Sequence, residues 1–435
     1  MGYSSWNDCG SVVTEAHIKA TATAMIESGL AAKGCARSAA SCSAFSVLPF
    51  APAFQRRTSL TPAGADIYVN VDEGWFVGRD PKTKAMVEDK KAFPSGMAGL
   101  GEWVHNLEVP GKGKIMKYGL YTSRGVQQCD TGEYIKRCAA SGLLHPPGRC
   151  EGTHGFEKED AAWLVGAGAD YLKEDSCGGN QTHSIAFSDY AKMRDALNAS
   201  ATAKGKKVFF SLCGWEDWYA PPDESIAYAG GPSLGNSYRI HGDGSSWDHL
   251  SGCTNTIAAI GKWSKPGGWA DPDLLIGPER GSSGDDHIGG QTDQQARTQF
   301  NLWAVFPAPM LISQNVMNFS AYAKQTYGNT EVIAINQDPV QPGRRGAGSG
   351  YKVGMRLAGG DLALPCAAKV NCTNVWGRPL SDGKSYVVAF VNNAAAAGSV
   401  ECDAACFAAL FDGAAPASSA PQAPHPTPCL ARALF

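Results

Sequence analysis

The chain has 435 residues, a formal net charge of −3 at pH 7, 43% hydrophobic residues and 18% charged residues. This composition is typical of a soluble globular protein and gives no electrostatic reason to expect nucleic acid or an acidic membrane as a partner. No apolar run approaches the roughly 20 residues that a membrane span requires, and no charged start followed by an apolar core marks a signal peptide. We therefore expect no nucleic acid and no membrane partner, and a small neutral ligand.

The 14 cysteines are many for a protein of a reducing compartment. Several fall in expected loops and resemble disulfide staples more than metal clusters, namely Cys9, Cys129, Cys177, Cys253, Cys402 and Cys406. Sequons for glycosylation start at Asn180, Asn198, Asn318 and Asn371. These features favour a secreted, lysosomal or vacuolar protein. Because Met1 falls directly on the expected first core strand, we interpret the lack of a leader as a missing start of the gene model.

Apolar, strand-like runs alternate with helical patterns along most of the chain, which indicates parallel β/α units. The expected strands cover 66–72, 114–122, 169–175, 207–213, 267–271 and 309–313. Apolar residues recur at helical spacing in two further segments, and we expect them to be core contacts. They are Ile18, Ala22, Met25 and Ile26, and Ala186, Tyr190, Met193 and Leu197.

The helical pattern fades from about Val340, and residues 386–392 read as a strand of a second, all-β domain. We therefore expect a larger domain over 1–339 and an incomplete β domain over 340–413. The tail at 414–435 has the composition of a disordered or atypical end. Two segments, 35–65 and 138–150, interrupt the β/α rhythm and are interpreted as insertions.

Lys173 and Asp175 occupy the end of the expected strand at 169–175, which runs into a loop of Ser, Cys and two glycines. Side chains two residues apart on a strand point the same way, so one face presents an ammonium beside a carboxylate. In an α/β barrel, this end of the strand carries the catalytic groups. A structural ion pair at a strand terminus is the alternative interpretation.

Asp243 provides a second carboxylate, at the expected end of a short strand and four residues after Arg239. Together with Asp175 it supplies the two carboxyl groups that cleavage of a glycosidic bond requires. If both residues lie at strand ends of one barrel, they face the same cleft.

Several motifs occur in a fixed order along the chain. They cover residues 1–7 (MGYSSWN), 71–75 (VDEGW), 118–121 (YGLY), 171–177 (YLKEDSC), 266–273 (PGGWADPD) and 331–339 (EVIAINQDP). Together they resemble glycoside hydrolase family 27, the α-galactosidase family, over most of residues 1–345 apart from the two interrupting segments. The resemblance implies a (β/α)8 TIM barrel followed by a smaller C-terminal antiparallel β-sandwich domain. It also implies no cofactor and no metal, and we expect a monomer or a homodimer.

The resemblance further implies a retaining exo-glycosidase that removes terminal α-linked galactose by double displacement, with Asp175 as nucleophile and Asp243 as general acid/base. Retention requires the two carboxyl groups about 5 to 5.5 Å apart. We expect the ammonium of Lys173 to depress the pKa of Asp175 and keep it ionised, while Asp243 holds a proton for the leaving oxygen.

The family's sugar contacts carry over to residues in matching motifs, namely Trp6, Asp72, Glu73, Tyr121, Lys173 and Arg239. Cys129 and Cys177 correspond to a family disulfide, with a free buried thiol as the alternative for each. Two departures stand out. Glu73 replaces the second of two adjacent aspartates, and Gly214 stands where many relatives have Glu, Asn or Ser. Trp215 is a candidate substrate contact that fills this space, and a core tryptophan is the alternative.

These departures leave other readings open. The preference between galactose and N-acetylgalactosamine is undecided, and a β-L-arabinopyranosidase shares the ring stereochemistry. A sugar-binding protein without turnover is a second class. A metal-dependent barrel enzyme with Asp72, Glu73, Asp175 and Asp271 as ligands is a third, although no typical metal-site spacing supports it. Segment 35–65 falls where relatives connect directly, and we interpret it as an unspliced intron.

Overall fold

The computed structural model describes residues 1–33, 66–129, 132–143, 148–214, 230–279, 290–340, 354–362, 373–382, 385–394 and 398–410. The expected insertion at 35–65 and the tail at 414–435 therefore lie outside the described residues. Among the helices that the structure describes, none combines the length and the apolar character needed to cross a membrane.

Eight strands form one parallel sheet that curves into a barrel. They are β1 (Gly2–Ser4), β2 (Ile67–Asn70), β5 (Met116–Ser123), β6 (Tyr171–Asp175), β7 (Phe209–Leu212), β8 (Ser237–Arg239), β9 (Trp269–Asp271) and β10 (Leu311–Ile312), in the order β10-β1-β2-β5-β6-β7-β8-β9. Leu275, just after β9, pairs in parallel with Ile312, and its N–H donates to the carbonyl of Leu311 at 2.9 Å. This pairing joins the two ends of the sheet and closes the expected (β/α)8 barrel.

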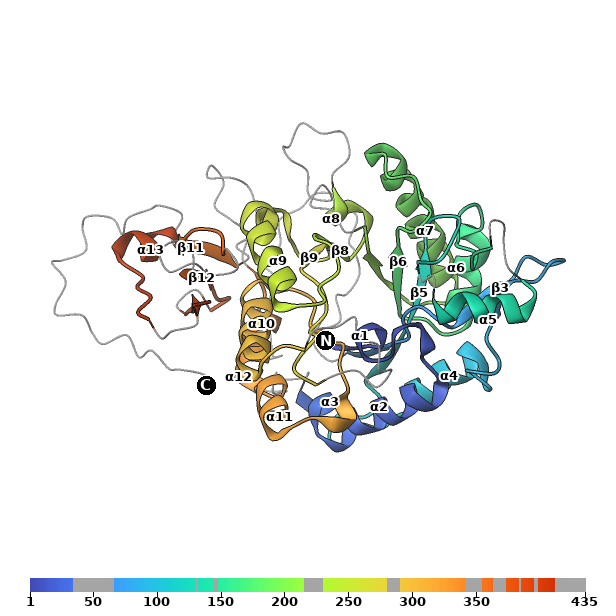
Figure 1. Cartoon of the computed structure of the whole chain (residues 1–435), viewed down its shortest axis with the longest axis horizontal. Coiled ribbons are helices and arrows are strands. Elements are labelled where there is room, and N and C mark those ends of the chain that lie inside the picture. Colours follow the sequence, from blue (N-terminus) through green and yellow to red (C-terminus); the bar gives the residue numbers. More distant parts are fainter. Residues whose placement is uncertain are drawn as a thin grey trace, which may run out of the picture.

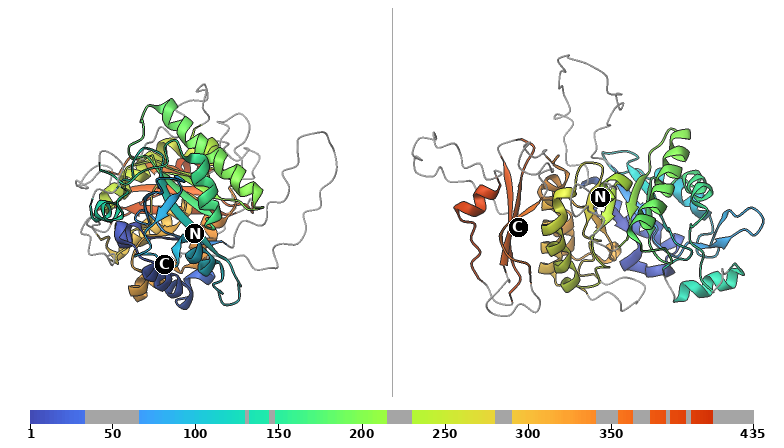
Figure 2. Two further views of the ribbon diagram at one scale, coloured as in Figure 1. Left: turned by 90° about the vertical axis from the view of Figure 1, so that its right-hand side faces the viewer. Right: turned by 90° about the horizontal axis from the view of Figure 1, so that it is seen from above.

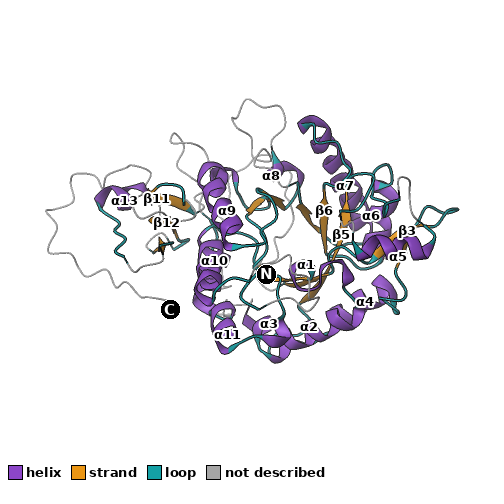
Figure 3. Ribbon diagram, in the orientation of Figure 1, coloured by secondary structure: helices purple, strands orange, loops and turns teal. Residues whose placement is uncertain are grey.

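Helices surround the strands on the outside of the barrel (Figures 1 and 3). Polar caps start several of them: Thr14 accepts a hydrogen bond from the N–H of His17, and Thr292 and Gln295 form a capping box. The helices are α1 (Trp6–Cys9), η1 (Gly10–Val12), α2 (Glu15–Glu27), α3 (Leu30–Lys33), α4 (Gly96–His105), α5 (Glu133–Ser141), α6 (Glu157–Gly166), α7 (His183–Ala203), α8 (Gly231–Leu234), α9 (Trp247–Ile260), η4 (Gly261–Trp263), α10 (Asp293–Val305), η5 (Val316–Asn318), α11 (Ala321–Tyr327) and α12 (Thr330–Gln337).

The two expected core stripes lie on α2 and α7. Ala186, Tyr190, Met193 and Leu197 are all buried, so the spacing of apolar residues identified the inner face of α7 correctly. On α2, Ile18, Ala22 and Met25 are buried, whereas Ile26 is only half-buried at the edge of the core. A separate two-stranded hairpin, β3 (Phe76–Arg79) with β4 (Met86–Glu88), follows the loop after β2.

A second, antiparallel sheet follows the barrel and consists of β11 (Met355–Gly359), β12 (Thr373–Pro379) and β13 (Tyr386–Asn392). Figure 2 shows this sheet beside the helices of the barrel. The rings of Trp376 on β12 and Phe306 after α10 lie 4.8 Å apart in an edge-to-face contact, so the sheet and the barrel share a core. The antiparallel sheet fits the expected C-terminal β-sandwich domain, and the short helix α13 (Ala404–Ala409) is an addition that the sequence did not predict.

The expected strands are present, and each covers fewer residues than predicted. The segment 207–213, for example, forms a strand over Phe209–Leu212, and the N–H of Cys213 beyond it still donates to the carbonyl of Glu174 at 2.9 Å. The interpretation of the cysteines was partly wrong. Cys253 lies buried within α9 rather than in a loop, and neither Cys9 nor Cys253 is in a disulfide.

Candidate active site

A pocket lies at the carboxyl ends of the barrel strands, where catalytic groups of such barrels gather. Apolar side chains and charged groups of both signs line it. The lining residues are Ser4, Asn70, Val71, Asp72, Leu120, Tyr171, Lys173, Ser211, Cys213, Arg239, Asp271, Asp273, Leu274 and Leu311. Residues from distant parts of the chain thus meet in one place because each lies on a barrel strand or just after one.

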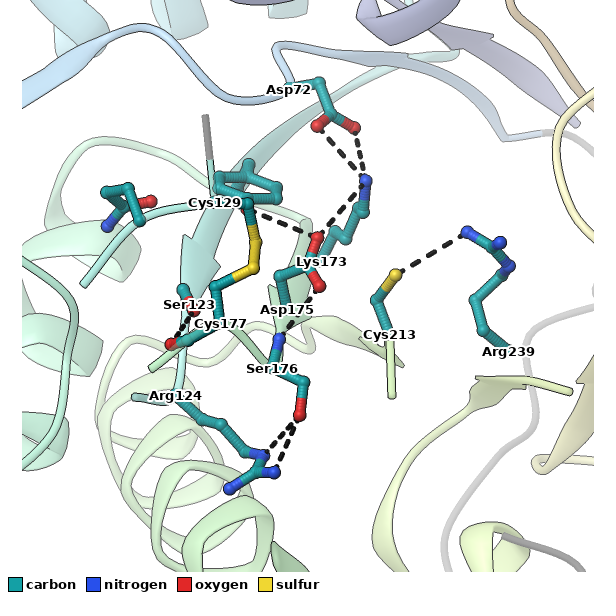
Figure 4. The surroundings of a disulfide bond; sticks show 12 residues. Asp72, Ser123, Arg124, Cys129, Lys173, Asp175, Ser176, Cys177, Cys213 and Arg239 are labelled. Carbon is teal, nitrogen blue, oxygen red and sulfur yellow. Dashed lines mark hydrogen bonds and ion pairs between the residues drawn. A yellow bond between two sulfur atoms is a disulfide. The ribbon is translucent and has the colours of Figure 1, made fainter. Parts of the chain in front are cut away.

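Lys173 and Asp175 lie on the same face of β6, as their spacing predicts. The ammonium of Lys173 lies 3.9 Å from Oδ2 of Asp175. It lies closer to Asp72, donating to both carboxylate oxygens at 3.1 Å. Figure 4 shows Lys173 between the two carboxylates. Burial alone lowers the pKa of Lys173, but the charge of Asp72 and the weaker effect of Asp175 raise it well above its usual value.

Aromatic side chains flank this cation. The ammonium of Lys173 lies 5.0 Å from the ring centroid of Tyr121 and 5.9 Å from that of Trp6. The hydroxyl of Tyr121 donates to Oδ2 of Asp175 at 3.2 Å. Burial raises the pKa of Tyr121 well above its usual value, and the charges of Asp175 and Glu73 raise it further. Glu73 is itself buried, so the structure gathers the expected sugar contacts around Lys173.

Arg239 and Asp243 form the opposite part of the site. Nη2 of Arg239 donates to Oδ1 of Asp243 at 2.9 Å. The expectation that Asp243 ends a strand was wrong, because β8 ends at Arg239 and Asp243 lies in the loop beyond. Its side chain is 61% exposed, whereas that of Asp175 is 7% exposed. The carboxyl group of Asp175 is therefore buried in the barrel, whereas that of Asp243 is exposed to solvent.

Asp273 also belongs to the site, although the sequence analysis assigned it no role. Its Oδ2 accepts hydrogen bonds from Nη2 of Arg239 at 2.7 Å and from the N–H of Gly244 at 2.6 Å. Its φ of 92° is unfavourable for a residue with a side chain, and strain of this kind collects at functional sites. The motif 266–273 contained Asp273, but its partner Arg239 is distant in sequence, so only the fold reveals the pair.

The pKa values of Asp175 and Asp243 are shifted in the directions opposite to those expected. Burial raises the pKa of Asp175 to about 6, although Lys173 acts to lower it. Loss of contact with water acts to raise the pKa of Asp243. The positive charges of Arg239 and Lys173 outweigh this effect and lower the pKa below its ordinary value. The predicted depression of the pKa of Asp175 was therefore wrong, because the cost of removing its charge from water exceeds the attraction to Lys173.

Two clusters among the described residues bring three potential metal ligands together, Asp8 with Cys9 and His17, and Cys129 with Asp175 and Cys177. In the first, the Tyr3 hydroxyl lies among the ligands, 2.7 Å from Oδ2 of Asp8 and 3.4 Å from Nε2 of His17. In the second, both cysteines are in a disulfide. Protein atoms alone account for both arrangements.

Comparison with known proteins supports the same conclusion as the geometry. A family model described as alpha-galactosidase A matches residues 59–338. The α-galactosidase of Cyamopsis tetragonoloba is 30% identical over 399 residues, which cover 89% of this chain and 71% of that protein. This chain belongs to the α-galactosidase family, glycoside hydrolase family 27.

Solved structures of the family agree with this barrel. The α-galactosidase of Saccharomyces cerevisiae is 25% identical with a TM-score of 0.62, and the match covers 90% of this chain and 73% of that one. A β-L-arabinopyranosidase of Geobacillus stearothermophilus shares the fold at 17% identity, with a TM-score of 0.58 and coverage of 90% of this chain and 83% of that one.

The disulfide that the α-galactosidase resemblance implies is present. Cys129 and Cys177 are bonded, which ties the loop after β5 to the loop after β6 beside the pocket (Figure 4). The two loops also touch at Gly125, where an added Cβ would lie 2.0 Å from the carbonyl oxygen of Cys177. Further disulfides join Cys138 to Cys150 and Cys402 to Cys406. The first of these closes the expected insertion at 138–150.

One predicted sugar contact has no structural account, because Trp215 lies outside the described residues. Cys213, two residues before Trp215, lines the pocket. It is a buried free thiol, and its sulfur lies 3.5 Å from Nη1 of Arg239. Of the other predicted site residues of this α-galactosidase family member, Asp72, Lys173 and Arg239 line the pocket, Trp6, Tyr121 and Asp175 lie beside Lys173, and Asp243 pairs with Arg239.

Proposed function

We propose that this protein is a retaining α-galactosidase that removes terminal α-linked galactose, with Asp175 as nucleophile and Asp243 as general acid/base. The observation that carries the proposal is the contrast between the two carboxyl groups. Asp175 is buried in the barrel beside Lys173, whereas Asp243 is exposed to solvent. In an exo-acting enzyme, the leaving group of the glycoside lies on the solvent side.

In the first step, the carboxylate of Asp175 attacks the anomeric carbon and the bond to the leaving oxygen breaks while Asp243 gives that oxygen a proton. In the second step, Asp243 takes a proton from water, the water oxygen bonds to the anomeric carbon, and the ester bond to Asp175 breaks. We expect a separation of about 5 to 5.5 Å between the two carboxyl groups in the working enzyme, as retention requires.

Recognition of galactose falls to the groups around Lys173. Asp72 and Glu73 would accept hydrogen bonds from ring hydroxyls, Lys173 and Arg239 would donate them, and Trp6 would offer an aromatic face. Buried polar groups of this kind reject sugars whose hydroxyls point elsewhere, because the groups are then left unpaired. Trp215, which follows Gly214 in the chain, remains our candidate for contact near the sugar's 2-position.

We further propose that the protein works in an oxidising compartment, either secreted or lysosomal or vacuolar, as a monomer or a homodimer without cofactor or metal. Three disulfides among the described residues support the compartment. We keep the domain boundary at residue 339, since α12 ends at Gln337 and β11 starts at Met355.

Parallel assays with nitrophenyl glycosides test the proposed activity. We expect hydrolysis of the α-galactoside to exceed that of the α-N-acetylgalactosaminide and the β-L-arabinopyranoside. Proton NMR of the first product formed should show α-galactose. Initial release of β-galactose would refute retention, and tight galactose binding without turnover would favour a sugar-binding protein.

A further inference from the structure

Arg124 is a buried cation directly behind the proposed nucleophile. It follows β5 in the chain, and its side chain is 1% exposed. Figure 4 shows the guanidinium on the side of Asp175 away from Lys173, reaching the hydroxyl of Ser176. A buried guanidinium is costly unless its donors are used, so its contacts define what it does.

Those contacts hold the backbone carbonyl of Asp175 and the residue after it, Ser176. Nε and Nη2 of Arg124 donate to the hydroxyl oxygen of Ser176 at 3.0 and 2.7 Å. The backbone N–H of Arg124 donates to the carbonyl of Asp175 at 2.9 Å. The N–H of Ser176 in turn donates to Oδ1 of Asp175 at 2.8 Å. Arg124 thus fixes the residue that supplies a hydrogen bond to the carboxylate.

The same guanidinium is anchored to the segment that follows β6. Nη1 lies 3.4 Å from Oδ2 of Asp189 on α7, and Nη2 donates to Oε1 of Gln181 at 3.1 Å. Its central carbon lies 5.2 Å from the ring centroid of Tyr190. The cation therefore connects the end of β6 both to the loop that follows it, through Gln181, and to α7, through Asp189.

We propose that Arg124 is a positioning residue that holds the carboxylate of Asp175 in its attacking orientation through Ser176. The inference rests on the proposed function, because it needs Asp175 to be the nucleophile. Oδ2 of Asp175 is held by Tyr121 and Oδ1 by the N–H of Ser176, so the two oxygens are fixed from opposite sides. Small misplacement of a reacting group lowers rate far more than binding, which gives the inference a distinct kinetic consequence.

The test compares Ser176→Ala, Arg124→Lys and the double variant with the parent enzyme. Ser176→Ala removes the hydroxyl that Arg124 holds but keeps the N–H that contacts Asp175. Competent sites are counted from complete labelling with an activated 2-deoxy-2-fluoro-galactoside, followed by intact mass. The kcat/KM per labelled site and the inhibition constant for galactose are then measured. Lys192→Ala is the matched control, because Lys192 pairs with the outer oxygen of Asp189 and its side chain is 52% exposed.

We expect each single variant to lower kcat/KM per labelled site by about 10- to 100-fold, with the galactose inhibition constant changed less than about threefold. The double variant should lose no more than the worse single variant, because both changes break one connection. Lys192→Ala should match the parent.

Ser176→Ala with an unchanged rate per labelled site would overturn the inference, even if Arg124→Lys does not fold. Equal losses in rate and galactose affinity would also overturn it, since they indicate general damage to the pocket. An inactive parent enzyme would instead refute the proposed function on which the inference rests.

Discussion

The ammonium of Lys173 donates to both carboxylate oxygens of Asp72, each at 3.1 Å. Its distance to Asp175, two residues along the same strand, is 3.9 Å. The cation is therefore shared, and its stronger partner comes from the loop after β2, a strand that β5 separates from β6. This sharing explains why Lys173 offsets only part of the effect of burial on Asp175, whose pKa is raised to about 6.

Replacement of Asp243 by alanine should have an effect that depends on the leaving group. Without a proton donor, glycosides with a basic leaving oxygen should lose about 10²- to 10⁴-fold in kcat/KM, whereas a dinitrophenyl galactoside should lose far less at this step. Azide should restore turnover of the activated substrate and yield α-galactosyl azide. Uniform losses across leaving groups would exclude Asp243 as the proton donor.

The pH dependence of kcat/KM should be bell-shaped with its alkaline limb near pH 6. In the active form of the enzyme, Asp175 and Asp243 together carry one proton. This last proton dissociates with the pKa of about 6 that Asp175 has in the folded protein. Activity should therefore fall tenfold per pH unit above that value. The acid limb should lie below the usual aspartate range, because the pKa of Asp243 is lowered. Initial rates at low substrate concentration measure both limbs, and a rate still rising between pH 6 and 8 contradicts the assignment.

Asp175→Asn should stabilise the protein at alkaline pH while abolishing turnover. The folded pKa of Asp175 is raised from 3.8 to about 6, so the neutral acid stabilises the fold below about pH 4 and this stability is lost as pH rises through 6. About two pKa units correspond to about 3 kcal/mol, which the neutral amide should recover at pH 8. Calorimetry at pH 4 and 8 compares the variant with the parent. An equal difference at both pH values would show that Asp175 is not destabilised by burial of its charge.

Opening the disulfide between Cys129 and Cys177 should lower both stability and activity. The bond spans 48 residues, so a Cys129→Ser/Cys177→Ser variant should lose about 2 to 4 kcal/mol of unfolding free energy. The variant should also have a lower kcat, because the loop that contains Cys177 follows directly after Asp175, the last residue of β6. The matched control is Cys402→Ser/Cys406→Ser, whose bond spans 4 residues far from the pocket. Equal effects on kcat from both variants would argue against a role for the first bond in the site.

Local pattern was enough to predict parallel β/α units and the strand-end position of Asp175, whereas the closed (β/α)8 barrel was implied by the family resemblance. Alternating apolar runs identify β/α units, and a period of two places Lys173 and Asp175 on one face. Three features were beyond it. The partner of Arg239 is Asp273, 34 residues away; the loop position of Asp243 depends on where pairing between β8 and β9 stops; and the pKa of Asp175 depends on burial that only the closed barrel creates.

The most direct test of the account is to trap the intermediate. The protein is incubated with an activated 2-deoxy-2-fluoro-galactoside, digested, and its peptides are mapped by tandem mass spectrometry. The account predicts a single fluorogalactosyl ester on Asp175, absent from the Asp175→Asn variant but still formed in Asp243→Ala, because an activated leaving group needs little help from a proton donor. Rapid hydrolysis of the α-galactoside together with an adduct on another carboxylate, or with no adduct at all, would contradict the central claim.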